Sequence, residues 1–174
     1  MAEKPTRILL VDDHQVLRDG LKVLLEIEED IEVIGEAPTG SEVLEKVRAL
    51  KPDMVIMDLG LPDISGIEVT RNLTEQMPNV AVIVLSMHVQ KEFVVKAIEA
   101  GAKGYVPKST THESLLEAIR RVRSGENYIH PMAASSLFES FSHEKEPEEK
   151  KYAQLTHRER EVFVLTANGF NSRE

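Results

Sequence analysis

The sequence predicts an α/β fold in which an open parallel sheet is covered by helices on both faces. Short runs rich in Val and Ile recur through residues 1–124, and stretches of helical length with one apolar face lie between them. Strands that alternate with helices are typical of parallel sheets, whose strands are apolar on both faces because both faces are covered. Five such units fit one doubly wound domain, and 41 % hydrophobic residues suffice for a packed core.

The expected elements follow one another regularly along the chain. The first predicted helix, within residues 14–27, places Val16, Leu17, Leu21 and Leu24 at helical spacing. The expected strands fall at residues 7–11, 31–37, 53–57, 80–85 and 103–106. The Ser/Thr-x-x-Glu capping pattern, which satisfies free N–H groups of a first helical turn, marks predicted helix starts at Thr39/Glu42, Ser65/Glu68, Thr110/Glu113 and Thr156/Glu159.

The regular alternation stops after residue 124. Residues 125–151 hold a possible short helix from about Pro131 and then the charged run "SHEKEPEEKK", which is typical of a linker. Residues 152–174 return to helical periodicity but are too few to complete a second core. We therefore expect one domain over residues 1–124, a linker over 125–151, and the start of an incomplete helical domain over 152–174.

Composition excludes several kinds of site and location. The chain has no cysteine, so it can form neither a disulfide nor a thiolate metal site. No apolar run approaches the roughly 18 residues of a membrane helix, and the N-terminus lacks a signal peptide pattern, so a cytoplasmic protein with no membrane partner is expected. The net charge of −9 argues against nonspecific nucleic-acid binding by the whole chain.

Polar side chains follow the ends of four predicted strands. Asp12 and Asp13 follow the first strand, Asp58 the third, Ser86 the fourth and Lys108 the fifth. Ligands bind outside the carboxyl ends of parallel strands, so these residues should meet in one crevice.

Their chemistry indicates a divalent cation and a phosphoryl group. Carboxylates held close together repel one another, and a hard cation such as Mg²⁺ removes that repulsion. One carboxylate could then attack a phosphoryl group, whose oxygens the cation, the lysine and the hydroxyl would stabilise. No P-loop or dinucleotide fingerprint follows any strand, which disfavours a nucleotide site.

Several segments resemble a known family. "LLVDDHQVLRDGL", "DMVIMDLGLPDISGIEV", "VIVLSMH" and "AGAKGYVPK" resemble the receiver domain of bacterial two-component response regulators, over about residues 5–124. "LTHREREVFVLTANGFNSRE" resembles the opening of the LuxR-type helix-turn-helix of the NarL/FixJ family. The resemblance implies a flavodoxin-like five-stranded sheet in the order 2-1-3-4-5, followed by a linker and an incomplete all-α helix-turn-helix segment.

The receiver resemblance implies a role for each acid at the sheet edge. It implies that Asp58 is the phosphoacceptor and that Asp12 and Asp13 serve Mg²⁺ together with Asp58, with Asp13 the more direct ligand of the acidic pair. The backbone carbonyl of Gly60 is implied as a further ligand. One position departs from the pattern, because Asp63 stands where relatives often have glycine or a small residue.

The resemblance also implies how phosphorylation is sensed. Ser86 and Lys108 match the hydroxyl and the lysine that contact the phosphoryl group, and Tyr105 matches the aromatic switch position. On phosphorylation, Ser86 would move toward the phosphoryl group and Tyr105 would enter the vacated space, which would remodel the surface over residues 90–123. A static core role for Tyr105 is the alternative reading.

The implied function is a switch that catalyses only its own phosphorylation and dephosphorylation. A sensor histidine kinase would donate the phosphoryl group, and the phosphorylated homodimer would bind DNA through a full output domain. The recognition helix that reads the major groove is not expected before Glu174, so no DNA-binding residue is assigned. The alternatives are a receiver acting by protein contact alone and an aspartyl-phosphate phosphatase. The phosphatase usually needs an acid two residues after its nucleophile, where Gly60 or His14 stands.

Overall fold

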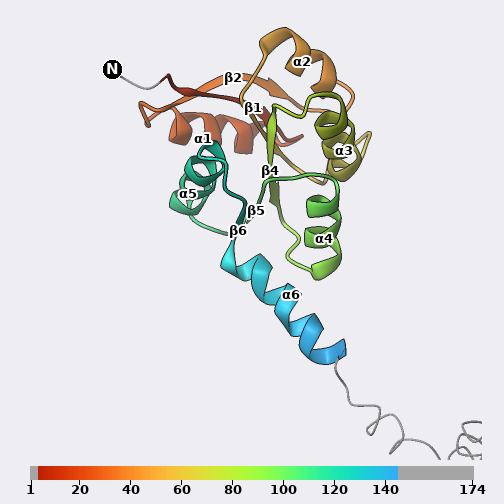
Figure 1. The fold of residues 1–174 in the computed structure, drawn as a ribbon. Helices are drawn as coiled ribbons and strands as arrows, with labels where there is room; N and C mark the ends of the chain where they lie inside the picture. The colour runs from red at the N-terminus through yellow and green to blue at the C-terminus, as the bar shows by residue number, and fades with distance from the viewer. Residues whose placement is uncertain (1–3, 145–174) are drawn as a thin grey trace, which may run out of the picture. The chain divides into compact units, whose positions relative to one another are not determined.

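The computed structural model describes residues 4–144, and residues up to Leu137 belong to one compact unit (Figure 1). A second unit begins at Phe138, and the structure describes only its first residues, at the end of a helix. The elements are β1 (Thr6–Val11), α1 (Gln15–Leu25), β2 (Ile31–Ala37), α2 (Val43–Leu50), β3 (Met54–Met57), α3 (Gly66–Gln76), β4 (Ala81–Ser86), α4 (Lys91–Glu99), β5 (Gly104–Pro107), α5 (His112–Arg123), β6 (Tyr128–Ile129) and α6 (Pro131–Glu144).

The strands form one parallel sheet in the order β2-β1-β3-β4-β5-β6. The doubly wound α/β prediction is confirmed, but the predicted number of five strands is wrong. Gly125 adopts a φ of +89°, which favours glycine, as the chain leaves α5, and the next residues pair with β5. The amides of Tyr128 and His130 donate to the carbonyls of Lys103 and Tyr105 at 2.9 Å. A strand of two residues has no apolar periodicity, so the sequence predicts only a linker at these residues.

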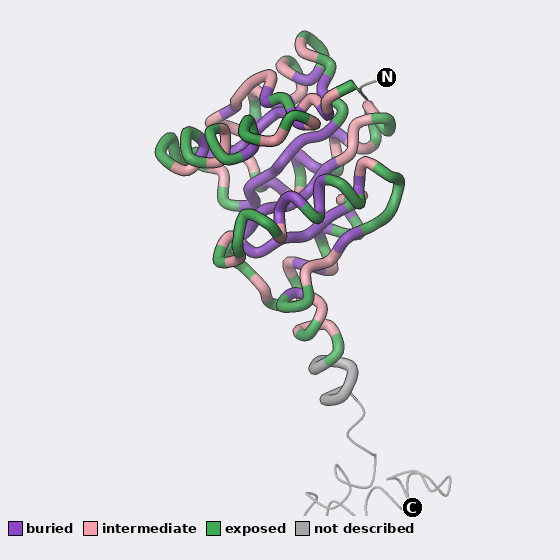
Figure 2. Tube along the Cα trace, turned by 90° about the vertical axis from the view of Figure 1, so that its left-hand side faces the viewer, coloured by how far each residue is buried: buried purple, intermediate pink, exposed green. Residues whose placement is uncertain are grey.

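Helices cover both faces of the sheet because successive strand residues point to opposite sides. In β1, Ile8 and Leu10 pack with α1 and α5, whereas Leu9 and Val11 pack with α2 and α3. α4 lies on the same face as α3 and packs on Tyr105 of β5. The central strands are buried on both faces (Figure 2). Within the described part of the chain, no helix is both long and apolar enough to cross a membrane.

The helix starts test the capping predictions. Ser65 is the N-cap of α3, and its side chain accepts a hydrogen bond from the amide of Ile67 at 3.3 Å. α2 and α5 begin later than predicted, after Glu42 and Thr111, and neither has a side-chain cap. The hydroxyls of the predicted caps bond elsewhere: Thr39 donates to the Glu42 carboxylate and Thr110 to the carbonyl of Pro107, both at 2.8 Å. The predicted start at Thr156 lies outside the described residues.

Candidate functional site

Two buried aspartates begin the site at the carboxyl edge of the sheet. Val11 and Met57 are register partners at the ends of β1 and β3, so Asp12 and Asp58 leave the sheet side by side. The amide of Asp58 donates to the carbonyl of Val11 at 2.9 Å, which fixes the start of the loop. Asp12 is 3 % exposed and Asp58 5 %, so water screens their mutual repulsion only weakly.

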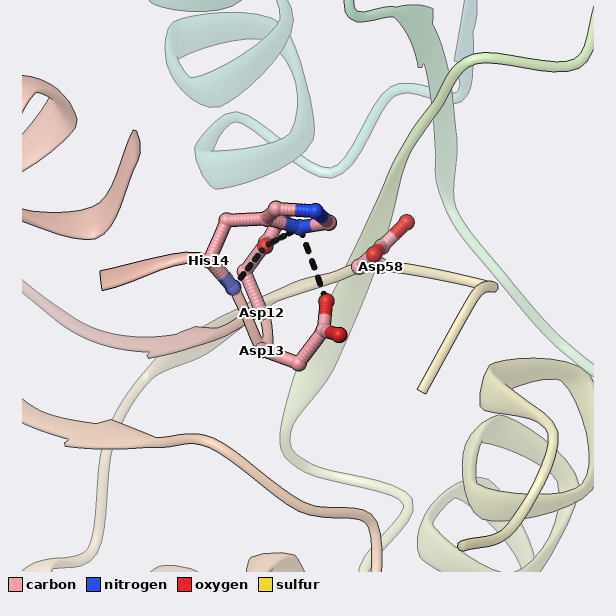
Figure 3. Close-up of side chains that lie close together, drawn as sticks. All are labelled: Asp12, Asp13, His14 and Asp58. Atoms are coloured by element: carbon pink, nitrogen blue, oxygen red, sulfur yellow. Dashed lines mark hydrogen bonds and ion pairs between the residues drawn. The ribbon is translucent and has the colours of Figure 1, made fainter. Parts of the chain in front are cut away.

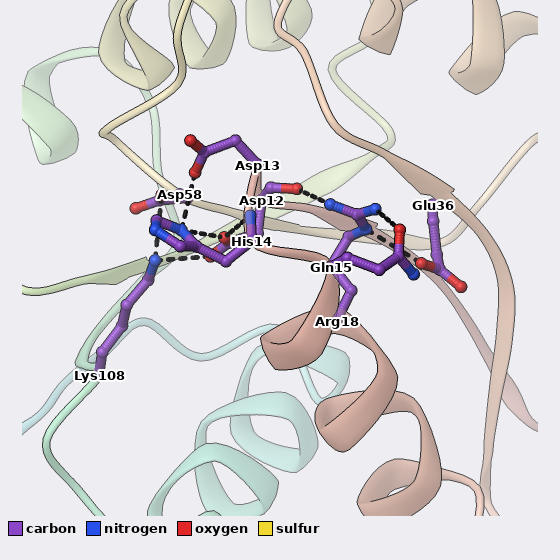
Figure 4. A network of polar contacts seen from close by, with 8 residues as sticks. All are labelled: Asp12, Asp13, His14, Gln15, Arg18, Glu36, Asp58 and Lys108. Atoms are coloured by element: carbon purple, nitrogen blue, oxygen red, sulfur yellow. Dashed lines mark hydrogen bonds and ion pairs between the residues drawn. The ribbon is translucent and has the colours of Figure 1, made fainter.

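Lys108 supplies the positive charge between these two acids (Figure 4). Its Nζ lies 2.5 Å from Asp12 Oδ2 and 3.0 Å from Asp58 Oδ2. The backbone positions this side chain, because the amide of Lys108 donates to the carbonyl of Ser86 at 2.8 Å. Burial alone would lower the pKa of Lys108, but the hydrogen bonds and charges of the two aspartates outweigh it and raise that pKa. The ammonium therefore stays charged between the acids.

Asp13 and His14 complete a cluster of metal-binding side chains (Figure 3). Ligand atoms of Asp12, Asp13, His14 and Asp58 all lie within 4.8 Å of one another. The Asp13 side chain is 32 % exposed, so the cluster opens to solvent on that side. Mg²⁺ prefers a few carboxylates and retains several waters, so two buried carboxylates beside an exposed one fit this ion.

His14 is the member of this cluster that sequence reasoning missed. Its Nδ1 lies 2.8 Å from Asp13 Oδ1 and 3.1 Å from Asp12 Oδ1, and its amide donates to Asp12 Oδ1 at 2.8 Å. Its position directly after the acidic pair was the available signal. The imidazole links the two carboxylates that the sequence placed together.

Gly66 lets the start of α3 lie close to the backbone of Asp58. Gly66 is the first residue of α3, and a Cβ there would lie 2.0 Å from the carbonyl oxygen of Asp58. Only glycine lets the helix start pack this tightly on the backbone of the acid. Gly60 is exposed beside the same residue, where a Cβ would lie 3.7 Å from Asp58 Oδ2.

Asp63, the departure noted in the sequence, stabilises the loop that follows Asp58. Its Oδ1 accepts a hydrogen bond from the amide of Gly40 at 2.8 Å, and its Oδ2 accepts one from the amide of Ser41 at 2.9 Å. These bonds hold the pKa of Asp63 well below its usual value, because they favour the charged carboxylate. The side chain thus ties the loop after β3 to the loop after β2.

Ser86 and Tyr105 meet at a third residue, His88. Ser86 Oγ accepts a hydrogen bond from the amide of His88 at 3.1 Å, and the Tyr105 hydroxyl donates to the carbonyl of His88 at 2.6 Å. Burial raises the pKa of Tyr105, and a hydrogen bond with Ser86 opposes that rise. The His88 ring stacks on Phe93 of α4, with ring centroids 4.2 Å apart. The two predicted switch residues are therefore connected to α4.

Comparison with known proteins decides the family. Residues 8–120 match the response regulator receiver domain. The chain belongs to the response regulator family. It is 38 % identical to the uncharacterized transcriptional regulatory protein YhcZ of Bacillus subtilis, over 97 % of this chain and 78 % of YhcZ. It is 34 % identical to the response regulator protein VraR of Staphylococcus saprophyticus, over 98 % of this chain and 79 % of VraR.

A solved structure agrees with this assignment. The fold is similar to that of a LuxR-family two-component response regulator from Aurantimonas sp., with a TM-score of 0.77 and 36 % identity, over 80 % of this chain and 99 % of that chain. The response regulator prediction from the motifs is confirmed. Residues 152–174, where the helix-turn-helix was predicted, lie outside the described residues.

Proposed function

We propose that a sensor histidine kinase transfers a phosphoryl group to Asp58 of this response regulator and thereby controls a DNA-binding output. The observation that carries the proposal is the Asp58 carboxylate at the sheet edge, held 3.0 Å from Lys108 beside the acidic pair Asp12-Asp13. This arrangement places a nucleophile, a fixed cation and a metal-binding donor set at one point.

The chemistry is an in-line transfer from a phosphohistidine. A carboxylate oxygen of Asp58 attacks phosphorus, the P–N bond to the donor imidazole breaks, and that imidazole retains the bonding electron pair and takes up a proton. Lys108, already between Asp12 and Asp58, would balance the charge of the phosphoryl oxygens.

The carboxylates of Asp12, Asp13 and Asp58 and the backbone carbonyl of Gly60 would hold Mg²⁺. When bound, Mg²⁺ neutralises charge on the transferring phosphoryl group.

The new charge would be sensed through Ser86 and Tyr105. The phosphoryl group would carry about two negative charges, where the free Asp58 carboxylate carries one, and it would supply strong hydrogen-bond acceptors. The Ser86 hydroxyl would turn from the His88 amide to a phosphoryl oxygen, and the bonds of Tyr105 to Ser86 and His88 would rearrange. Because the His88 ring stacks on Phe93, a shift of His88 would also move the start of α4.

The output would reside in the C-terminal part of the chain. Among the relatives of this chain, YhcZ is named as a transcriptional regulatory protein and VraR as a response regulator protein. With the receiver spanning residues 1–124 and the linker 125–151, residues 152–174 would begin the helix-turn-helix domain of the full protein. Phosphorylation would favour a homodimer that binds DNA in the cytoplasm.

The experiment is phosphorylation by a small acyl phosphate with Mg²⁺, followed by intact-mass measurement. The wild-type chain should gain one phosphoryl group, and a chelator should prevent the gain. Asp58→Asn should gain none, because an amide is a poor nucleophile. Asp53→Asn is the matched control, since Asp53 Oδ2 accepts from the Arg7 amide at 2.9 Å near the start of β1, far from the site. A full-yield adduct on Asp58→Asn would contradict the proposal.

A further inference from the structure

Arg18 of α1 is a buried charge beside the acidic cluster. Its side chain is 6 % exposed, although arginine is almost never buried without partners. A guanidinium has several N–H donors and no acceptor, so each buried donor needs an oxygen. The partners of Arg18 therefore indicate what this residue does.

Three elements supply those partners (Figure 4). Arg18 Nη1 donates to the backbone carbonyl of Asp12, and Nη2 donates to the side-chain oxygen of Gln15. Nε donates to Glu36 Oε2 at 3.0 Å. The guanidinium thus joins the end of β1, the first turn of α1 and the end of β2.

The contact with Asp12 fixes the peptide between the two acids. The carbonyl of Asp12 and the amide of Asp13 belong to one planar peptide unit, so holding the oxygen also sets the direction in which Asp13 leaves it. The amide of Asp12 is held on its other side, where it donates to the carbonyl of Ala37 at 3.1 Å. Asp12 is therefore bonded to the protein at both ends, and the orientation of Asp13 follows from it.

A gain in folding stability does not explain well why the ion pair between Arg18 and Glu36 is present. Desolvation of two charges offsets most of their attraction, and an apolar pair of similar volume is often as stable. The Glu36 side chain is 25 % exposed and its second oxygen lies 4.0 Å from Lys22 Nζ, so Glu36 has a further cation nearby. Unlike Lys22, Arg18 also donates a hydrogen bond to the backbone carbonyl of Asp12.

We propose that Arg18 is a positioning residue for the divalent cation: its guanidinium holds the Asp12–Asp13 peptide so that the Asp13 carboxylate faces Asp58. The inference rests on the proposed function, since it concerns the same cation site. Arg18 would act like the residues at other metal sites that hydrogen-bond to a ligand without binding the metal themselves. Loss of one such hydrogen bond typically weakens metal binding about 10–100-fold.

The test measures Mg²⁺ affinity by titration calorimetry on the whole chain, without a phosphodonor. Arg18→Met keeps much of the length and apolar volume but loses every donor, and it should raise the Kd for Mg²⁺ about tenfold. Arg18→Lys keeps the charge but lacks the planar fork, and should raise the Kd almost as much. Asp13→Ala is the positive control. Arg120→Met is the matched control for charge. Arg120 lies on α5, where its Nη2 is 2.6 Å from the Glu28 carboxylate, and it does not contact the acidic cluster.

A second measurement separates positioning from folding. Phosphorylation rates over a range of Mg²⁺ concentrations should show a higher half-saturating concentration for the Arg18 variants, with most of the rate restored at saturation. Urea unfolding of each variant reports its stability independently. If Arg18→Met does not fold, the Arg18→Lys result decides the question.

The outcomes are distinguishable. A Kd in the folded Arg18 variants equal to that of Arg120→Met would overturn the positioning role while leaving phosphorylation of Asp58 intact. A wild-type chain that binds no Mg²⁺ and gains no phosphoryl group would instead reject the proposed function. A raised Kd in the Arg18 variants but not in Arg120→Met supports the inference.

Discussion

Replacing Gly66 by alanine should destabilise this response regulator, although Gly→Ala in a helix normally stabilises. Gly66 opens α3, and a Cβ there would lie 2.0 Å from the carbonyl oxygen of Asp58 and 2.8 Å from Cα of Leu59. Ordinary van der Waals contact begins near 3.4 Å, so the two backbones would have to separate by about 1.4 Å. The atoms that must move are backbone rather than flexible side chain.

The magnitude follows from two opposed terms. Alanine gains about 1 kcal/mol over glycine within a helix. Overpacking typically costs about 1–3 kcal/mol, and a rigid backbone neighbour favours the upper end of that range. The net expectation is a loss of about 2 kcal/mol, or a fall in Tm of roughly 4–8 °C for a chain of this length. Because the displaced carbonyl belongs to Asp58, phosphorylation should also slow markedly.

The assay is urea unfolding of two variants that carry the same substitution. Gly20→Ala is the control, since Gly20 lies in the exposed part of α1 and a Cβ there would meet nothing within 4 Å. Gly20→Ala should gain about 0.5–1 kcal/mol, opposite in sign to Gly66→Ala. Equal stabilisation by both substitutions, with normal phosphorylation of Gly66→Ala, would refute the steric argument.

Two further predictions concern charged residues at the site. Asp63→Asn should lower the free energy of unfolding near neutral pH, because the charged acceptor of two hydrogen bonds from backbone amides is lost. Because the pKa of Asp63 is lowered in the folded protein, this loss of stability should shrink as the pH falls below 3.8. Lys108→Met should lower the free energy of unfolding by about 3–5 kcal/mol, because Asp12 and Asp58 lose their shared cation. Because the pKa of Lys108 is raised in the folded protein, this loss should persist up to pH 10.5 and shrink at higher pH, as the wild-type lysine deprotonates. Unfolding curves measured across pH check both, and a deficit independent of pH would contradict either.

The strands and the main site residues were predictable because their signals are local. Ile8 and Leu9 are both fully buried on opposite faces of β1, and an apolar run bounded by polar residues reports that environment directly. In a parallel sheet the strand ends lie along one edge, so Asp12, Asp58 and Lys108 could be brought together without coordinates.

Two roles that the sequence does not predict, those of Arg18 and Asp63, depend on contacts between distant segments. Arg18 bonds to Glu36 across 18 residues, and Asp63 bonds to Gly40 across 23, and neither spacing has a sequence signature. Arg18 is one charged residue among many in the sequence, and Asp63 stands out only as a departure from the family pattern, which does not indicate its bonding partners. Charged residues are usually exposed. Only the placement of β2 and its following loop beside the site gives them partners. β6 was missed for a related reason, since pairing with β5 rather than its own composition makes it a strand.

These contacts divide the site into a fixed side and a side that can change. Around Asp58 charged side chains hold backbone groups: Arg18 holds the Asp12 carbonyl, and Asp63 holds the amides of Gly40 and Ser41. Around His88 two hydroxyls make the bonds, and a neutral hydrogen bond contributes only about 1 kcal/mol net because a new partner can replace the old one. A phosphoryl group offers charged acceptors, whose hydrogen bonds are worth about twice as much. Under the proposed function, the added charge would therefore exchange the bonds at His88 while the bonds that hold the acidic pair remain in place.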